Sequence, residues 1–379
     1  MKTNALPRYR RATLAAGAAL LMALTGCAST TTPETSATST TSGAATTSSS
    51  ETATASESTA VATVVSAADA FLATLDDSQV SEVVLDLTND NAAAWSNLPC
   101  GSDCRNGIQF STLSDAQLTA AKAVLQAALN TSTGVGYDQA MQILLADDVL
   151  GSAGSGGGGG GGNYSSGTYF LAFLGEPSTD GTWMLQFGGH HLAVNVTYSD
   201  GAVEGGSPFF IGVEPTSWTD DDGTSYAPLD IMKDAVEAMI TSLSSDELSQ
   251  AKLSESFTDV LMGPDQDGAF PETKSGIAVS SLSDDQQQLV LAAMTPWVSI
   301  VDDQSAEDLL AVYESELDET YISYSGSTDL TSQGDYIRID GPSVWIEFVC
   351  QNGVVYSDQI HYHTVYRDHT RDYGGELSF

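Results

Sequence analysis

Basic side chains are scarce in this sequence. Its 379 residues include 12 Lys and Arg against 50 Asp and Glu, which gives a formal net charge of −38. Binding to nucleic-acid phosphates requires clustered Lys and Arg, so we expect no nucleic-acid partner. The hydrophobic content of 41% is still sufficient for a folded core, and the chain is therefore not expected to be disordered throughout.

The N-terminus lacks a hydrophobic run long enough to span a membrane. The apolar stretch from Ala12 to Leu24 has 13 residues, fewer than the ~20 that cross a bilayer. Basic residues precede this stretch, and Leu24-Thr25-Gly26-Cys27 ends it. The pattern predicts a signal peptide over residues 1–26, and its end resembles a bacterial lipobox in which Cys27 is lipidated. An ordinary signal peptide with a chance cysteine is the alternative.

Residues 28–60 contain no aromatic residue, no Lys and no Arg. They are mainly 12 Thr, 9 Ser and 7 Ala, which cannot bury enough apolar surface to offset the entropy lost on ordering. We therefore expect residues 27–60 to be a lipidated cysteine and a disordered tether. The tether would connect a folded body at residues 61–379 to the extracytoplasmic face of the cell membrane, which is the expected partner of the anchor.

Cysteines are few, four in all. Cys100 and Cys104 lie in the turn-rich stretch Pro99-Cys100-Gly101-Ser102-Asp103-Cys104. In an oxidising compartment this spacing predicts a local disulfide, with a metal-binding thiolate pair as the alternative. Cys350 falls on the apolar side of a predicted strand, and we expect a buried thiol there.

The folded body contains an internal sequence repeat. Ala70–Leu75 matches Ala238–Leu243 at an offset of 168 residues, and Leu113–Gln117 matches Leu282–Gln286 at 169. Both members of the second pair begin Leu-Ser-Asp, which predicts a helix start with Ser or Asp as the N-cap. Chance similarity is the alternative to duplication.

Strand-like segments continue the repeat at a shorter offset. Leu185–Gly189 matches Ile337–Gly341 at an offset of 152 residues. The offset is thus shorter by 17 residues than before, which agrees with a Gly/Ser-rich insertion at residues 151–167 of the first half. We predict an α+β fold of two similar helix-then-strand halves, about 66–212 and 230–379, with mixed or antiparallel sheets.

Four short motifs carry a family resemblance. Together they resemble the bacterial family known as domain of unknown function 3500, from about residue 66 to the C-terminus. That family usually has His where Ser96 stands and Asn where Ile360 stands. The resemblance implies no settled activity. The motifs are Trp95-Ser96-Asn97-Leu98-Pro99, Phe173-Leu174-Gly175-Glu176-Pro177, Gly189-His190-His191-Leu192 and His361-Tyr362-His363-Thr364-Val365-Tyr366-Arg367-Asp368.

All five histidines fall within or just after two of these motifs. The stretch after Gly189 alternates with period 2 and reads as a strand, which would place His191 and Asn195 on one face and His190 on the other. We expect His190 to pack under the sheet, with metal ligation as its less favoured role.

A second predicted strand, residues 360–367, places His361, His363 and Arg367 on one face. Two imidazoles at i and i+2 can chelate one metal ion, and His191 would supply a third nitrogen. Three His ligands with an open position are typical of zinc or copper. A metal-free polar site and purely structural histidines remain the alternatives.

Three further polar residues complete the predicted site. Glu347 could be a fourth ligand or a general base, and Asn195, at the equivalent place in the first half, could orient a ligand. Arg367 could bind an anionic substrate group or form an ion pair with a nearby acid. These roles favour a metal-dependent hydrolase or oxidoreductase outside the cytoplasm. The alternative is a non-catalytic ligand- or metal-binding surface lipoprotein.

Overall fold

The structure is a computed structural model that describes residues 48–154 and 164–379. The predicted signal peptide, Cys27 and the tether up to residue 47 lie outside the described residues. None of the helices in these two ranges combines the length and the apolar character needed to cross a membrane.

Hydroxyl and carboxylate side chains begin several helices. The Ser114 and Ser283 hydroxyls each accept a hydrogen bond from a backbone N–H. The side chains of Gln117 and Gln286 in turn accept one from the N–H of these serines, so both sites are capping boxes. The predicted Leu-Ser-Asp helix starts are therefore confirmed. The helices are α1 (Ser48–Leu72), α2 (Asp77–Val83), α3 (Asn89–Ala93), α4 (Asp115–Ala128), α5 (Gly136–Gly154), α6 (Asp230–Thr241), α7 (Ser245–Ala251), α8 (Asp284–Val298) and α9 (Asp303–Ser315).

Twelve strands of the described chain form one sheet, and two more form a small separate ribbon. The ribbon is β8 (Trp218–Thr219) with β9 (Ser225–Tyr226). The sheet contains β1 (Val84–Leu85), β2 (Ile108–Gln109), β3 (Phe170–Leu174), β4 (Thr182–Gly189), β5 (Leu192–Ser199), β6 (Ala202–Gly205), β7 (Phe209–Val213), β10 (Ile277–Ala278), β11 (Tyr321–Ser325), β12 (Tyr336–Asp340), β13 (Val344–Asn352) and β14 (Ile360–Asp368).

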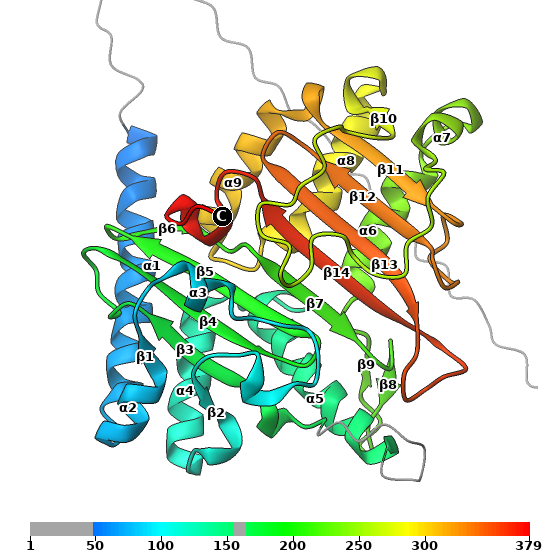
Figure 1. Ribbon diagram of the computed structural model, residues 1–379. Helices are drawn as coiled ribbons and strands as arrows, with labels where there is room; N and C mark the ends of the chain where they lie inside the picture. Colours follow the sequence, from blue (N-terminus) through cyan, green and yellow to red (C-terminus); the bar gives the residue numbers. More distant parts are fainter. Residues whose placement is uncertain (1–47, 155–163) are drawn as a thin grey trace, which may run out of the picture. The chain divides into compact units, whose positions relative to one another are not determined.

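The strand order of the sheet is symmetrical about its centre. It runs β1-β3-β4-β5-β7-β14-β13-β12-β11-β10, with β2 beside β3 and β6 beside β5 (Figure 1). β7 and β14 pair antiparallel in the middle, whereas β1 and β3 are parallel. The α+β class with a mixed sheet is therefore confirmed.

The two faces of the sheet are covered differently. Leu192 and Ile211 are register partners in the main hydrophobic core, on the face that packs against the helices, and Thr364 beside Ile211 accepts a hydrogen bond from Trp297 of α8 on that face. On the other face lie their neighbours Phe210 and Val365, and there the sheet is covered by chain segments with little regular structure (Figure 1). We call this side the loop-covered face, and the covering segments are residues 86–107, 253–276 and 369–379.

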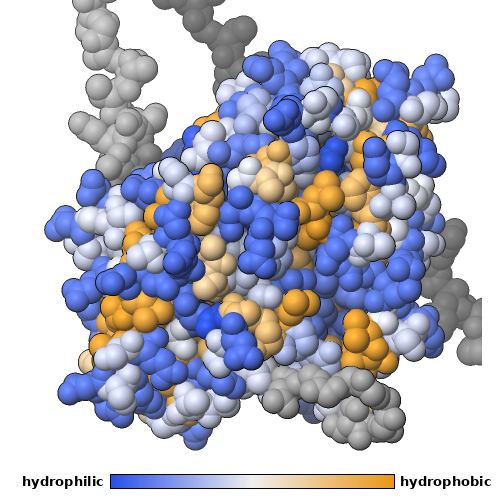
Figure 2. Space-filling view, in the orientation of Figure 1, coloured by the Kyte–Doolittle hydropathy of each residue, from blue (hydrophilic) through white to orange (hydrophobic). Residues whose placement is uncertain are grey.

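The outer surface over the loop-covered face is mostly hydrophilic. Figure 2 shows hydrophobic residues there in small, separated groups rather than in one broad patch. Two of the most exposed large apolar side chains are Leu98, at 59%, and Val354, at 65%. The predicted site residues therefore lie beneath a polar covering.

Two expectations about segment boundaries need correction. α1 begins at Ser48, so the prediction of a disordered tether is wrong for residues 48–60. The apolar residues Val61, Val64 and Phe71 anchor this helix in the core, and each residue added to a formed helix gains a hydrogen bond at little cost. In the predicted Gly-rich insertion, α5 continues to Gly154 and a short 3-10 turn occupies Ser166–Thr168, while residues 155–163 lie outside the described ranges.

Candidate metal centre

His190 and His191 form a turn, not the start of a strand. β4 ends at Gly189, which pairs with Leu192 at the start of β5, so the two histidines connect the strands of a hairpin. His191 has φ 62°, a left-handed conformation that a strand excludes. The prediction that the strand begins directly after Gly189 is wrong. A turn of two residues does not interrupt the period-2 alternation of the sequence, so the pattern could not reveal it.

The turn is fixed to the rest of the sheet by backbone hydrogen bonds. The N–H of His191 donates to the Asn97 carbonyl at 3.2 Å, and the N–H of Gly212 donates to the His191 carbonyl at 2.7 Å. Gly212 lies opposite His363 in the β7–β14 pair. A Cβ atom at residue 212 would approach the His363 ring to 2.7 Å and the His191 ring to 3.1 Å, so glycine leaves the space that the imidazoles occupy.

His361 and His363 lie on one face of β14, as predicted, and His191 meets them there. The ring centroids are 5.4 Å apart for His191 and His361, 5.0 Å for His191 and His363, and 4.8 Å for His361 and His363. Each of the three offers a ring nitrogen within 4.8 Å of the others, and all three side chains are buried. This arrangement could hold a metal ion.

Burial controls the protonation of two of these rings. It lowers the pKa of His191 well below its ordinary value, and the neighbouring histidines lower it further. Burial and the His363 ring lower the pKa of His361 to about 3. Both imidazoles are therefore uncharged at neutral pH and keep a ring nitrogen lone pair.

Two acid–histidine contacts flank the cluster, one with the buried Asp147 and one with Asp259, whose side chain is 47% exposed, and the sequence analysis missed both acids. Asp259 Oδ1 lies 3.0 Å from His363 Nδ1, and Asp147 Oδ1 lies 2.8 Å from His190 Nδ1. Burial alone would raise the pKa of Asp259, but hydrogen bonds with the His363 ring and the Val260 N–H lower it. A carboxylate that accepts from Nδ1 leaves Nε2 of the same ring free to bind a metal. No motif marks these acids, because one lies in α5 and the other in a loop.

Glu347 lies on the loop-covered face but does not contact the histidines. Its carboxylate accepts hydrogen bonds from the N–H groups of Leu261 and Met262, from Trp345 Nε1 and from the Tyr336 hydroxyl, at 2.6–2.9 Å. Burial raises its pKa, and these bonds oppose the rise. The carboxylate is therefore saturated by structural donors, which argues against its predicted role as ligand or base.

Arg367 is likewise committed to its neighbours. Its guanidinium lies 2.6 Å from Asp372 and 2.6 Å from Asp267, and it donates to the Met262 carbonyl at 3.2 Å. The side chain is only 1% exposed. Of the two roles considered for Arg367, the structure favours the ion pair over the binding of an anionic substrate.

Asn195 also serves the fold rather than the cluster. Its Nδ2 donates to the Pro208 carbonyl at 2.8 Å, and its Oδ1 accepts from Gln186 at 3.1 Å. No hydrogen bond joins it to any of the described histidines. The hydrogen bonds of Asn195 therefore do not support its predicted role in orienting a ligand at the histidines.

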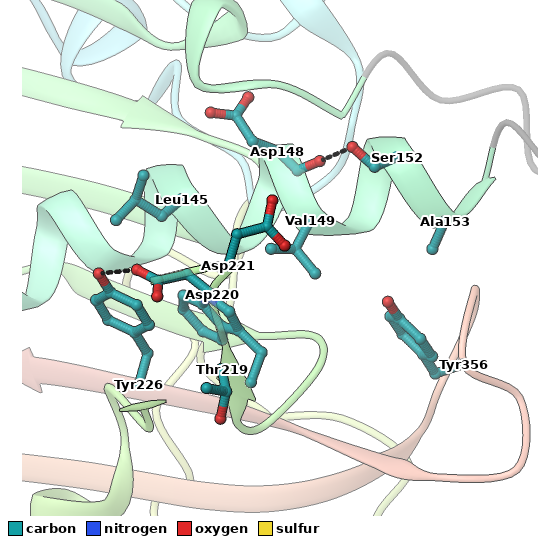
Figure 3. Close-up of a pocket in the computed structure, with 11 residues that line it drawn as sticks. Leu145, Asp148, Val149, Ser152, Ala153, Thr219, Asp220, Asp221, Tyr226 and Tyr356 are labelled. Atoms are coloured by element: carbon teal, nitrogen blue, oxygen red, sulfur yellow. Dashed lines mark hydrogen bonds between the residues drawn. The ribbon is translucent and has the colours of Figure 1, made fainter. Parts of the chain in front are cut away.

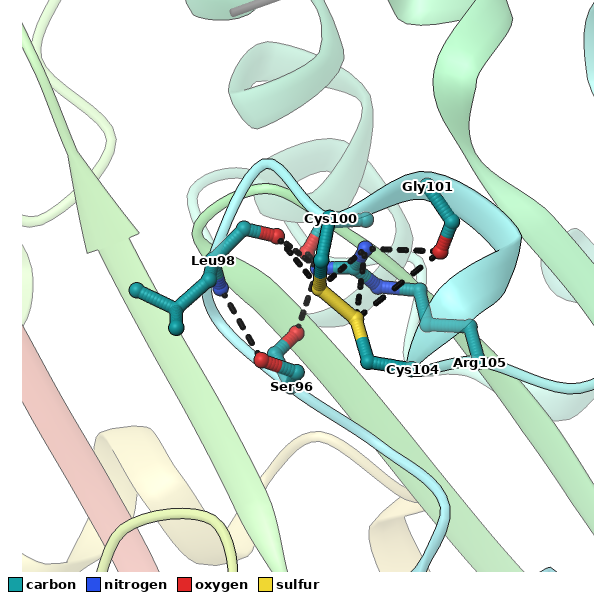
Figure 4. The surroundings of a disulfide bond; sticks show 7 residues. Ser96, Leu98, Cys100, Gly101, Cys104 and Arg105 are labelled. Atoms are coloured by element: carbon teal, nitrogen blue, oxygen red, sulfur yellow. Dashed lines mark hydrogen bonds between the residues drawn. A yellow bond between two sulfur atoms is a disulfide. The ribbon is translucent and has the colours of Figure 1, made fainter.

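The disulfide loop fastens the histidine turn. Cys100 and Cys104 are joined, and Arg105 reaches past them into the protein (Figure 4). Nη2 of Arg105 donates to the carbonyls of Ser96, Leu98 and Gly189, at 2.5–2.7 Å. Because Gly189 precedes the His190–His191 turn, this guanidinium ties the turn to the disulfide loop. Cys350 is a free, buried thiol, as predicted, and burial raises its pKa.

An open pocket of about 610 Å³ contains none of the three clustered histidines in its lining. Trp218, Tyr226 and Tyr356 line it together with acids that include Asp148 and Asp221 (Figure 3). None of the predicted site residues lines this pocket. The histidine cluster, not this pocket, is therefore the candidate centre.

Comparison with known proteins gives a family but no activity. No curated protein and no solved structure is significantly similar to the chain. The family model described as protein of unknown function (DUF3500) matches residues 57–375, which include every described residue of the cluster. The chain therefore belongs to the DUF3500 family of proteins of unknown function.

Proposed function

We propose that the protein binds a transition-metal ion, zinc or copper, between His191, His361 and His363. The observation that supports this most directly is the separation of 3.2 Å between Nε2 of His361 and Nε2 of His363. Two nitrogen ligands at ~2.0–2.1 Å from a tetrahedral zinc ion are about 3.3–3.4 Å apart. The pair thus already has nearly the spacing that such a centre requires.

The surroundings of His363 support a ligand role over a purely structural one. A structural imidazole would direct its nitrogens to backbone carbonyls, whereas Nε2 of His363 faces another imidazole and Nδ1 faces the side chains of Asp259 and Gln351. A carboxylate behind a histidine fixes the tautomer and raises the basicity of the ligating nitrogen. His361, His363 and Asp259 therefore have the arrangement of metal ligands with an outer-shell acid.

Catalysis is the second candidate activity, as a metal-dependent hydrolase or oxidoreductase. Three His ligands leave a fourth tetrahedral position for water or substrate. A pocket of about 290 Å³ borders His190, next to the cluster, and gives solvent a path toward it. Because Glu347 and Arg367 are engaged elsewhere, an enzyme would need another base and another substrate-binding group. A non-catalytic metal-binding role needs neither.

Metal analysis tests the binding proposal. We expect the chain from residue 28 onward, purified without tag or chelator, to carry at least one zinc or copper ion per molecule by elemental analysis. The double variant His361→Ala/His363→Ala should lose the ion held by the three histidines, because two of its three ligands are gone. His369→Ala is the matched control, since His369 is exposed and outside the cluster. A chain that binds no metal even after reconstitution would contradict the proposal.

We further propose that the protein is a lipoprotein held outside the cytoplasm by Cys27. The basic start, the short apolar run and the Leu-Thr-Gly-Cys sequence support this. Replacement of Cys27 by Ser should move the full-length protein from the membrane fraction to the soluble fraction after cell lysis, measured by immunoblotting. Unchanged membrane association of the variant would argue against a lipid anchor at this residue.

We also propose that the fold arose by internal duplication. In support, the strand order is symmetrical about the β7–β14 pair. In addition, Gln117 Nε2 donates to Gln79 in the capping box of α2, and Gln286 Nε2 donates to Glu247 in the capping box of α7. The same contact thus recurs 169 residues later, at the offset of the sequence repeat. The three-His cluster would then combine one residue of the first half with two of the second.

A further inference from the structure

A second group of buried potential ligands adjoins the three-histidine site. Asp147, His190 and His191 each offer a ligand atom within 4.8 Å of the others, and all three are buried. We propose that this group holds a second metal ion, with His191 shared between the two positions. The inference extends the proposed function to a two-ion centre, and its ligands Asp147 and His190 lie outside the first site.

The group is already organised as a coordination site. Asp147 projects from α5, and its Oδ1 lies 2.8 Å from His190 Nδ1. The Tyr169 hydroxyl lies 2.9 Å from Asp147 Oδ2 and 2.7 Å from the His190 carbonyl. The fully buried Tyr169 hydroxyl can donate to one carboxylate oxygen of Asp147 while the other oxygen binds a metal.

The His190 and His191 rings lie against each other. Their centroids are 3.7 Å apart with an interplanar angle of 29°. A neutral imidazole has one nitrogen lone pair, and release of the proton on its other nitrogen to water gives an imidazolate that can bind a second ion. His191 belongs to both groups of potential ligands, which makes it the residue that would connect the two positions.

Charge balance favours a cation beside Asp147. Its side chain is 1% exposed, and its two oxygens lie within hydrogen-bond distance of His190 Nδ1 and the Tyr169 hydroxyl. Among the described residues, no Lys or Arg forms an ion pair with it. Arg105 attracts it from a distance but donates its own hydrogen bonds to backbone carbonyls and cysteine sulfurs. A buried carboxylate is costly without a positive partner, and a divalent ion would supply one.

Solvent can reach this position. His190 lines the pocket of about 290 Å³ together with Arg105, Gln109 and the Pro99–Asp103 loop. Water from that pocket can complete the coordination that one carboxylate and two imidazoles leave open. A mixed oxygen and nitrogen ligand set of this kind suits Zn²⁺.

Zinc stoichiometry tests the inference. The metal-free chain from residue 28 onward is titrated with zinc chloride by calorimetry, and bound zinc is counted by elemental analysis after desalting. We expect two ions per chain in the unaltered protein and one in Asp147→Asn, which keeps the size of the side chain but removes its charge. His190→Gln should also reduce the count to one, which covers the case in which Asp147→Asn does not fold by circular dichroism.

The control is Asp148→Asn. Asp148 is the next residue of α5, but it lines the separate pocket of Figure 3 and accepts a hydrogen bond from the Ser166 N–H. This variant should still bind two ions. An unaltered protein that binds a single ion, or an Asp147→Asn variant that loses none, would overturn the inference and leave the Asp147–His190 contact as an orienting hydrogen bond.

The same titration separates this inference from the proposed function. If His361→Ala/His363→Ala retains one ion that Asp147→Asn then removes, both positions exist as proposed. If the double variant loses nothing while Asp147→Asn loses one ion, the second position stands and the three-histidine site fails. If one ion is bound and only the double variant loses it, the three-histidine site stands alone.

Discussion

Replacement of Arg367 by Met is expected to lower the free energy of unfolding by about 3–5 kcal/mol, as the loss of one partner from a buried ion pair typically does. The substitution keeps much of the side-chain volume but leaves the carboxylates of Asp267 and Asp372 without their cation. Against a typical total stability of about 5–15 kcal/mol, this is a large loss. Urea unfolding followed by tryptophan fluorescence measures it.

Arg371→Met provides the matched control for this prediction. Arg371 lies four residues later, its side chain is 33% exposed, and its contact with Asp368 is 3.5 Å. We expect a smaller loss, of about 1–2 kcal/mol, because the contact is longer and the buried Asp368 carboxylate keeps its hydrogen bonds from Tyr313 and Thr370. A similarly small effect for Arg367→Met would mean that its guanidinium is not a structural cation, and the role in binding an anionic substrate would return.

Replacement of Glu347 by Ala is expected to cost about 4 kcal/mol or more while leaving the metal content unchanged. The substitution removes the acceptor of four hydrogen bonds, three of them buried, and each hydrogen bond to a charged group contributes about 1.5–3 kcal/mol. Two of these donors are the N–H groups of Leu261 and Met262, so the substitution should also loosen the segment that covers the sheet. Urea unfolding and elemental analysis on the same preparation measure both effects.

Glu237→Gln is the control for that experiment. Glu237 forms an ion pair with Lys233 at 2.6 Å on the surface of α6, and its side chain is 33% exposed. We expect little change in either stability or metal content. Loss of a bound ion in a folded Glu347→Ala variant would show that Glu347 takes part in the metal centre after all, as the sequence had suggested.

The sequence predicted the faces of the strands but not what covers them. The spacing of His361, His363 and Arg367 places them correctly on one side of β14. Glu347 lies on that side too, opposite Val365. Period-2 alternation, however, contains no information about the segment 253–276. The backbone and side chains of this segment form hydrogen bonds with both Glu347 and Arg367. The placement of both residues was right, and the ion pair considered for Arg367 is present, whereas the contacts of Glu347 argue against its role as ligand or base.

The acids of the site could not be found from the sequence. Asp147 and Asp259 are two of 50 Asp and Glu residues, and neither stands at a recognisable spacing from a histidine. Only the packing of α5 and of the loop after α7 brings them to His190 and His363. The capping boxes at Ser114 and Ser283 were predictable because every group in them lies within four residues along the chain.

The order of the strands along the chain has a consequence for biosynthesis, because β14 follows every other strand of the sheet in the described residues. His361 and His363 lie near the C-terminus, and β14 occupies the middle of the sheet between β7 and β13. A chain that emerges N-terminus first, from a ribosome or an export channel, presents Asp147, His190 and His191 long before these two residues. The three-histidine cluster can therefore form only after β14 has emerged. Under the proposed export of the protein, the ions of the compartment in which β14 folds, rather than those at the site of synthesis, would decide which metal is bound.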